Sequence, residues 1–260
     1  MSDFLSKIIT SRLLRVQEAE AKIGFPEVKR LAAEAVSRRD VRKFIPRPET
    51  EIGIIAEIKR ASPAAGVIAR DVDVERLAGE YTRGGAAAIS VLTEPDFFAG
   101  SPETLIAARR VSAVPVLRKD FVVAEYQIYE SAVMGADMVL LIARLLEAGQ
   151  LAEYAALTRE LGMEPLVEIF CPEDAEKLTG CNARLVGINN RDLKTFAVNP
   201  KRALEMVKYA EAGATPIIAS AIKTPEDVRF YTEQGVNHFL IGESLMRSAD
   251  PEAELRKFAS

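Results

Sequence analysis

Eight short apolar runs, each followed by a segment of helical pattern, limit the possible folds of this chain more than any other feature. The runs cover residues 54–58, 87–92, 114–117, 138–142, 165–169, 185–188, 216–220 and 238–241. Helical patterns follow the first seven runs at residues 74–83, 102–111, 125–134, 146–161, 172–178, 201–209 and 225–234, and a short helical segment opened by Gly242 follows the eighth. Strands that alternate with helices form parallel sheets, and eight such units in 260 residues favour a closed barrel. We therefore predict an α/β protein with the (β/α)8 (TIM) barrel fold.

An open, doubly wound sheet is the alternative arrangement of the same elements. That fold places a glycine-rich dinucleotide turn after its first strand, whereas this chain continues with Lys59-Arg60-Ala61-Ser62-Pro63. Before the first strand, Leu5, Ile8 and Val16 recur at helical spacing, and Pro26 suits the first turn of a second helix. We expect one domain over residues 1–260, in which residues 1–48 form a helical extension packed on the barrel.

The composition excludes several classes of function. A net charge of −4, with Lys and Arg scattered along the chain, gives no basic stretch to neutralise a nucleic-acid backbone. No apolar stretch approaches the roughly 20 residues of a membrane span, and the N-terminus lacks a signal-peptide pattern. With His238 as the one histidine and Cys171 and Cys181 as the two cysteines, a zinc site and a Ser-His-Asp triad lack support. We predict a cytoplasmic protein without nucleic-acid, membrane or metal partners.

Polar side chains stand at the ends of most predicted strands, where barrel enzymes build their active sites. In the first run, Ile55, Glu57 and Lys59 share one face, so a carboxylate and an ammonium group point the same way. A buried charge is costly unless it is paired or useful, which indicates a site, with a structural ion pair as the alternative. The later strand ends carry Lys119, Glu168, Asn189, Arg191, Ser220 and Gly242.

Each of these residues has chemistry available to it. Desolvation of Lys119 beside Lys59 would lower the pKa of its ammonium group and make it a general acid near neutrality. Glu168 follows two apolar residues, where a buried carboxyl group suits acid–base work. Gly242 opens a short helical segment whose free N–H groups would bind phosphate, although a simple strand-to-helix turn explains the glycine equally well. The expected partner is a small phosphorylated substrate.

A set of motifs extends over nearly the whole chain. They are Ile55-Ala56-Glu57-Ile58-Lys59-Arg60-Ala61-Ser62-Pro63, Ser90-Val91-Leu92-Thr93-Glu94, Leu117-Arg118-Lys119-Asp120-Phe121, Tyr126-Gln127-Ile128-Tyr129-Glu130, Leu166-Val167-Glu168, Gly187-Ile188-Asn189-Asn190-Arg191-Asp192-Leu193 and Gly242-Glu243-Ser244-Leu245-Met246. In order and spacing they resemble the indole-3-glycerol phosphate synthase family of tryptophan biosynthesis. The resemblance implies a single barrel with extra N-terminal helices, no metal or organic cofactor, and a monomer, with a dimer as the alternative. The implied lyase reaction closes the indole ring of 1-(o-carboxyphenylamino)-1-deoxyribulose 5-phosphate with loss of CO2 and water.

The resemblance also implies residue roles. Lys119 would be the general acid that activates the substrate carbonyl, and Lys59 would hold the substrate carboxylate and assist ring closure. Glu168 would serve the later dehydration, and Glu57 would orient the lysines. The implied substrate-binding residues are Asn189, Arg191, Ser220, Phe121, Leu92 and Ser62, with Phe121 and Leu92 forming the slot for the aromatic ring. The implied phosphate-binding residues are Gly242, Glu243 and Ala221.

Several positions depart from the family pattern. The family reads Ser-Glu-Ser-Gly-Ile after the seventh strand, where this chain has Ile218-Ala219-Ser220-Ala221-Ile222. Ala219 thus replaces an active-site glutamate, and Ala221 replaces a glycine and adds a Cβ atom near the phosphate. Ala65 stands where the family has a loop lysine, and Ala124, Phe170 and Ala197 occupy positions that are commonly polar.

These departures keep two other interpretations open. In a repurposed or engineered barrel, Glu57, Glu168 or Glu243 would abstract a proton in a Kemp-elimination-type reaction, or Lys59 or Lys119 would form a Schiff base for retro-aldol cleavage. A redesign for a new substrate has little reason to keep the native lysines and glutamates, which this chain retains. A barrel that only binds a ligand would lose its strand-end charges, and most are kept. We therefore predict a synthase, with turnover weakened where Ala219 replaces glutamate.

Overall fold

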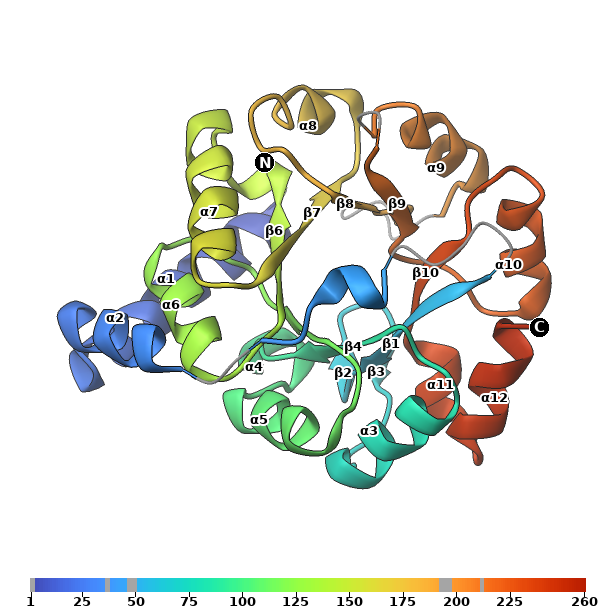
Figure 1. Cartoon of the computed structure of the whole chain (residues 1–260), viewed down its shortest axis with the longest axis horizontal. Helices are drawn as coiled ribbons and strands as arrows, with labels where there is room; N and C mark the ends of the chain where they lie inside the picture. Colours follow the sequence, from blue (N-terminus) through green and yellow to red (C-terminus); the bar gives the residue numbers. More distant parts are fainter. Residues whose placement is uncertain (1–2, 36–37, 46–50, 192–197, 211–212) are drawn as a thin grey trace.

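Eight parallel strands close into a barrel in the computed structural model, which describes residues 3–35, 38–45, 51–191, 198–210 and 213–260 (Figure 1). Around the barrel the order is β1, β4, β5, β6, β7, β8, β9 and β10, and β10 pairs with β1. The strand bounds are β1 Gly53–Ile58, β4 Ala88–Leu92, β5 Val116–Lys119, β6 Met138–Ile142, β7 Glu164–Ile169, β8 Leu185–Ile188, β9 Thr215–Ile218 and β10 His238–Ile241. The predicted (β/α)8 barrel is confirmed.

Helices join successive strands and surround the barrel (Figure 1). Several begin at a capping side chain: Asp73, Asn199 and Thr224 each accept a hydrogen bond from a backbone N–H of the first turn. No helix in the described ranges is long and apolar enough to cross a membrane. The helix bounds are α3 Val74–Arg83, α4 Pro95–Phe98, α5 Pro102–Val111, α6 Tyr126–Val133, α7 Ala148–Glu160, α8 Pro172–Glu176, α9 Pro200–Val207, α10 Pro225–Thr232, α11 Glu243–Arg247 and α12 Pro251–Phe258, with the 3-10 turns η1 Val41–Lys43 and η2 Ala143–Leu145.

Strand alternation sorts the buried apolar side chains into two clusters. In β1, Ile54, Ala56 and Ile58 belong to the cluster that includes the outer helices, whereas Ile55 belongs to the cluster inside the barrel. Glu57 therefore shares the inner face with Ile55, at the carboxyl end of the strand. The middle of the barrel interior is apolar, and Glu57 lies at its carboxyl end, whereas Glu164, Thr215 and His238 are buried polar residues at the amino ends of their strands.

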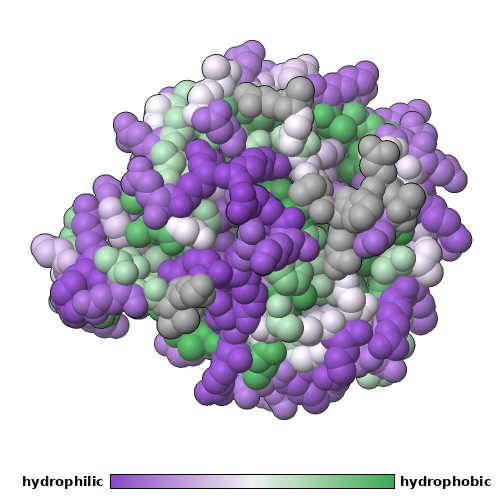
Figure 2. All heavy atoms as spheres, viewed as in Figure 1, coloured by the Kyte–Doolittle hydropathy of each residue, from purple (hydrophilic) through white to green (hydrophobic). Residues whose placement is uncertain are grey.

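Residues 38–45 close the opposite end of the barrel. Val41 and Ile45 are buried in the inner cluster, and the segment crosses the centre of the view in Figure 1. Hydrophilic residues run across the centre of this face in Figure 2. The Arg39 backbone N–H donates to Asp137 Oδ1 at 2.7 Å, and the Arg39 guanidinium donates to Oδ2 at 3.1 Å. Asp137 precedes β6, so these bonds fix the segment to the amino ends of the strands.

Two helices precede this segment, α1 Asp3–Lys22 and α2 Phe25–Glu34. Val16 and Val28 pack on Tyr126 of α6, and the Tyr126 hydroxyl donates to the carbonyl oxygens of Ala19 and Ile23. The predicted helical extension packs on the barrel over its described part. Its predicted boundary at residue 48 and Ala197 lie outside the described residues.

The bounds of the strand that carries Lys119 differ from the prediction. The predicted run was 114–117, whereas β5 is Val116–Lys119, because the Ser112 side chain bonds both the N–H and the carbonyl of Val114 and holds that residue in a turn. Lys119 is thus the last strand residue, with its orientation set by the pleat. The short hairpin of β2 Ala61–Ser62 and β3 Gly66–Val67 was not predicted, since two-residue strands carry no periodic signal.

Candidate active site

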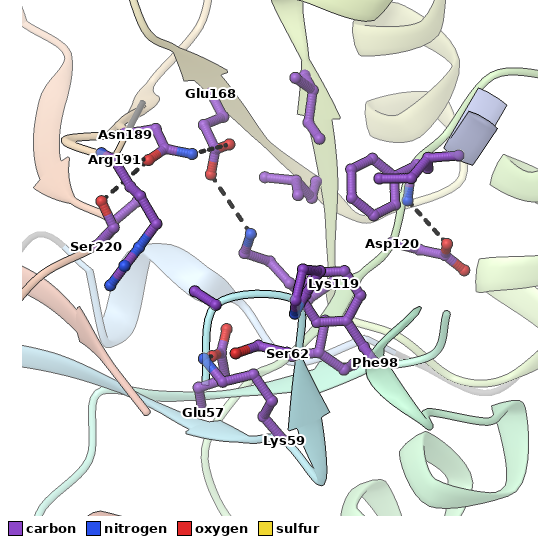
Figure 3. Close-up of a pocket in the computed structure, with 18 of the residues that line it drawn as sticks. Glu57, Lys59, Ser62, Phe98, Lys119, Asp120, Glu168, Asn189, Arg191 and Ser220 are labelled. Carbon is purple, nitrogen blue, oxygen red and sulfur yellow. Dashed lines mark hydrogen bonds and ion pairs between the residues drawn. The ribbon is translucent and has the colours of Figure 1, made fainter. Parts of the chain in front are cut away.

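A cavity of about 180 Å³ lies at the carboxyl ends of the strands (Figure 3). Strand register places Leu92 beside Lys119, and Ile142 beside Glu168. The predicted site residues that line the cavity are Glu57, Lys59, Ser62, Leu92, Lys119, Phe121, Glu168, Asn189, Arg191, Ser220 and Glu243. The other lining residues are Leu5, Ile8, Pro63, Ala64, Phe98, Asp120, Leu140, Ile142 and Ala219.

Each predicted lysine is paired with a carboxylate. Lys59 Nζ lies 2.5 Å from Glu57 Oε1, and Lys119 Nζ lies 3.4 Å from Glu168 Oε2 (Figure 3). The four side chains are 6% to 18% exposed, so water screens these ion pairs less than it would at the surface. Two cations and two anions are therefore held together with little net charge.

The pairing overturns the prediction that Lys119 has a lowered pKa. Burial does lower the pKa of the ammonium group, but the carboxylates of Glu168 and Glu57 outweigh it and leave the pKa raised above its ordinary value. The prediction counted Lys59 as a neighbour and left out the two carboxylates. Lys119 is consequently protonated throughout the neutral range and can act as a proton donor.

A chain of hydrogen bonds connects Glu168 to the neighbouring strand ends. Asn189 Nδ2 donates to Glu168 Oε1 at 3.1 Å, and Ser220 Oγ donates to Asn189 Oδ1 at 3.0 Å (Figure 3). The Arg191 N–H also donates to Asn189 Oδ1 at 3.0 Å. Asn189 is thus fixed on both sides of its amide group, and Ser220 holds it in place while it also lines the cavity.

One side of the cavity is apolar. The rings of Phe98 and Phe121 lie 5.9 Å apart between centroids, and Leu92, Leu140 and Ile142 extend this wall. Phe98 belongs to the one-turn helix α4, whose first backbone N–H groups donate to the Glu94 carboxylate. A flat aromatic group fits this wall better than a polar one because it keeps apolar surface away from water.

A second cavity of about 90 Å³ adjoins the first on the side of β9 and β10. Its cationic side chains are Lys59, Arg191 and Lys223, and Gly242, Glu243 and Ala221 also line it. The helix that starts at Glu243 is only five residues long, so a helix dipole contributes little there.

Gly242 has a steric role that neither sequence interpretation included. A Cβ atom at this position would lie 2.6 Å from Glu57 Oε1, closer than such contacts occur. Ala221 has φ of +69°, in the left-handed region that favours glycine. Gly242, with φ of −128°, is thus constrained by the space for a Cβ atom, whereas Ala221 holds a backbone conformation that glycine adopts without strain.

Comparison with known proteins decides the family. The family model described as indole-3-glycerol phosphate synthase matches residues 5–258. The chain belongs to the indole-3-glycerol phosphate synthase family. The protein of that name from Carboxydothermus hydrogenoformans is 46% identical over 95% of this chain and 96% of its own length. The one from Desulfosudis oleivorans is 42% identical over 99% and 98%.

The predictions of the family and of a lyase are confirmed at this level. The relatives named here carry the synthase name, which gives the repurposed-barrel alternative no support. Solved structures of other proteins share the fold alone. Crystal structures of 3-hexulose-6-phosphate synthase from Salmonella typhimurium and KGPDC from Streptococcus mutans superpose with TM-scores of 0.64 and 0.61 at 15% and 13% identity. Each covers 80% of this chain, with 96% and 95% of its own length.

The departures from the family pattern do not gather at one ligand. Ala219 lines both cavities and Ala221 the smaller one. Ala124 packs instead against the cluster of α1, α2 and α6. Phe170 lies between the guanidinium groups of Arg144 and Arg202, at 4.5 and 4.0 Å. The departures that remove side-chain volume or add a Cβ atom beside the two cavities are therefore Ala219 and Ala221.

Several lining residues were not among the predicted site residues. Leu140 and Ile142 alternate with the outward residues of a predicted strand, so the period-two pattern could have identified them. Phe98, Leu5 and Ile8 lie on helices, where no local pattern indicates that an apolar side chain meets a cavity and not the core. Among the described residues, no group of three or more His, Cys, Asp or Glu side chains is placed to hold a metal ion.

Proposed function

We propose that this protein closes the indole ring of 1-(o-carboxyphenylamino)-1-deoxyribulose 5-phosphate, releasing CO2 and water and leaving indole-3-glycerol phosphate. One observation carries the proposal: the cavity with the apolar wall adjoins a cationic recess at Lys59, and Lys59 and Lys119 are each paired with a carboxylate. The substrate has the same division, with an aromatic ring at one end and a phosphate at the other. Family membership supports the same reaction.

In the first step the ring carbon that bears the carboxylate attacks the carbonyl carbon, while Lys119 donates a proton to the carbonyl oxygen. Lys119 enters the step protonated, and because its pKa is raised it donates this proton less readily than a lysine with a lowered pKa would. The carboxylate then leaves as CO2, and its bonding electrons restore the aromatic ring. In the last step the new hydroxyl group takes up from solvent the one proton that the reaction consumes overall and leaves as water, while Glu168 accepts the proton that the adjacent carbon loses.

The remaining residues bind and orient the substrate in this proposal. Lys59, held by Glu57, binds the substrate carboxylate with help from Arg191, and Asn189 binds the sugar hydroxyl groups. Leu92 and Phe121 contact the aromatic ring, and Ser62 and Ser220 close the polar side. The backbone at Gly242 and Glu243, with Ala221, receives the phosphate. Weakened turnover is expected, because Ala219 supplies no carboxylate at the junction of the two cavities.

The test is the appearance of indole fluorescence when the purified protein meets the substrate. The parent should turn over, and Lys119→Met should lower kcat by about 10²–10⁴-fold, the usual contribution of a positioned acid. Lys22→Met, at an exposed position of α1, is the matched control and should behave as the parent. A silent parent and a silent Ala219→Glu variant, both folded, would overturn the proposal, whereas activity only in Ala219→Glu would locate the loss at that position.

The proposal also includes the finer predictions from the sequence: one domain over residues 1–260, a monomer, and a cytoplasmic location. Cys171 and Cys181 form no disulfide bond in the described part of the chain, which supports a reducing compartment. Light scattering on the purified protein measures its molecular mass. We expect the mass of one chain, and the mass of two chains would contradict the monomer.

A further inference from the structure

The N-terminal helix contributes side chains to the catalytic cavity. Leu5 and Ile8 of α1 line it and are 3% and 1% exposed. They are three positions apart, so they lie on the same face of the helix. The same cavity is lined by Phe98 and Phe121, and both added side chains are aliphatic. Part of the apolar wall therefore comes from a helix outside the (β/α)8 unit.

Ionic contacts fix α1 to both loops that carry the aromatic rings. Arg12 donates to Asp120 Oδ2 at 3.0 Å, and Asp120 Oδ1 accepts the N–H of Phe121 at 2.8 Å. Arg15 donates to Asp96 of α4 at 2.7 Å, and Ser11 also bonds Asp96. The contacts with Asp120 thus position α1 relative to the Phe121 ring. Because α4 carries Phe98, the contacts with Asp96 position α1 relative to the Phe98 ring.

Asp120 is itself firmly held. Its Oδ2 atom also accepts hydrogen bonds from Arg118 at 3.0 Å and from the Thr93 hydroxyl at 2.6 Å, and the residue is 2% exposed. A helix anchored to such a group does not drift from the cavity. Its side chains therefore act as a fixed boundary for whatever the cavity holds.

We propose that α1 sets the size of aromatic ring that the cavity accepts, and that Ile8 is the specificity-determining residue of this boundary. The inference rests on the proposed function, since it concerns the benzene ring of that substrate. Ile8 is a binding residue remote from the ionic groups that carry the chemistry, so shortening it should change KM more than kcat. Removing methyl groups from an apolar pocket changes selectivity by about 10-fold or more per group.

The experiment compares Ile8→Ala and Ile8→Val with Leu14→Ala, which lies on the same helix with its side chain 55% exposed. The two substrates are the unsubstituted compound and one that carries a methyl group on the benzene ring. Ile8→Ala should raise KM for the unsubstituted substrate about 10-fold, leave kcat within about 2-fold, and shift the kcat/KM ratio toward the methylated substrate by about 10-fold. Ile8→Val should move in the same direction by a smaller factor, and Leu14→Ala should match the parent.

A second measurement does not depend on turnover. Calorimetric titration with the two substrates after reduction of the carbonyl to an alcohol, which cannot close the ring, should give the same selectivity change in Kd. If the parent makes no indole product but Ile8→Val still shifts these Kd values, the proposed function fails and the boundary stands. If the parent turns over and the Ile8 variants keep its selectivity, in kcat/KM and in Kd, the boundary is refuted. The Val variant keeps the test valid should the Ala variant not fold.

Discussion

Replacing Ala221 by glycine should stabilise the protein. The backbone of Ala221 has φ of +69°, a conformation that costs a residue with a Cβ atom about 1–2 kcal/mol. Glycine relieves that cost but frees the unfolded chain, which offsets about 0.4–1 kcal/mol. The mid-range values leave a net gain of about 0.8 kcal/mol in the free energy of unfolding. For a chain of this length that corresponds to a rise in Tm of roughly 2–3 °C.

Urea unfolding followed by circular dichroism measures the effect. The midpoint should rise with an unchanged m-value, since the surface exposed on unfolding stays the same. Ala156→Gly is the matched control, because Ala156 is exposed in the middle of α7 and has no backbone strain to relieve. That variant should lose about 1 kcal/mol. If Ala221→Gly lowers the midpoint as the control does, the left-handed backbone of Ala221 stores no strain and the reasoning fails.

Three further predictions concern groups that the structure holds under constraint. Gly242→Ala should lower kcat while the protein stays folded, because the new Cβ atom would displace the Glu57 carboxylate that lies 2.6 Å away. An unchanged kcat would show that the Glu57 side chain can move aside without loss of activity. Lys119 should react with an acylating reagent more slowly than exposed Lys22 throughout the neutral and mildly alkaline range, because its raised pKa leaves less free amine; mass spectrometry of the peptides measures the two rates, and equal rates would contradict the ion-pair argument. Burial raises the pKa of Glu164 in the folded protein, so the stability this residue contributes is fully present below its unfolded pKa of about 4.3 and is lost as the pH rises. Glu164→Gln should therefore raise the urea midpoint at neutral pH and leave it nearly unchanged near pH 4, whereas an equal gain at both would refute the assignment.

Much of the fold was predictable because a barrel repeats one simple pattern. Each strand is short, apolar and followed by an amphipathic helix, so eight units are recognisable even where a boundary such as that of β5 is wrong by two residues. The error at β5 came from a side chain, Ser112, that bonds the backbone locally and delays the strand. Such competition between local and ladder hydrogen bonds leaves no trace in hydrophobic periodicity.

The candidate site was predictable to the extent that it lies at strand ends. Glu57, Lys119 and Glu168 were found from position alone, and they line one cavity. What failed was the electrostatic consequence, because the pKa of Lys119 depends on which charges lie within a few ångströms, and a sequence gives no distances. The side chains of α1 were missed for the same reason, since their partners lie on distant parts of the chain.

The contacts of the N-terminal extension also constrain how the chain can assemble during synthesis. Arg12 bonds a residue 108 positions later, and Arg39 bonds one 98 positions later. Translation proceeds from the N-terminus, so α1 and residues 38–45 reach their binding sites only after β5 and the start of β6 have emerged. Until then the apolar faces of Ile8, Val16 and Val28 have no native surface to cover them. The N-terminal helices therefore wait for roughly the first half of the barrel, and their docking sites are complete while β7 to β10 are still to be made.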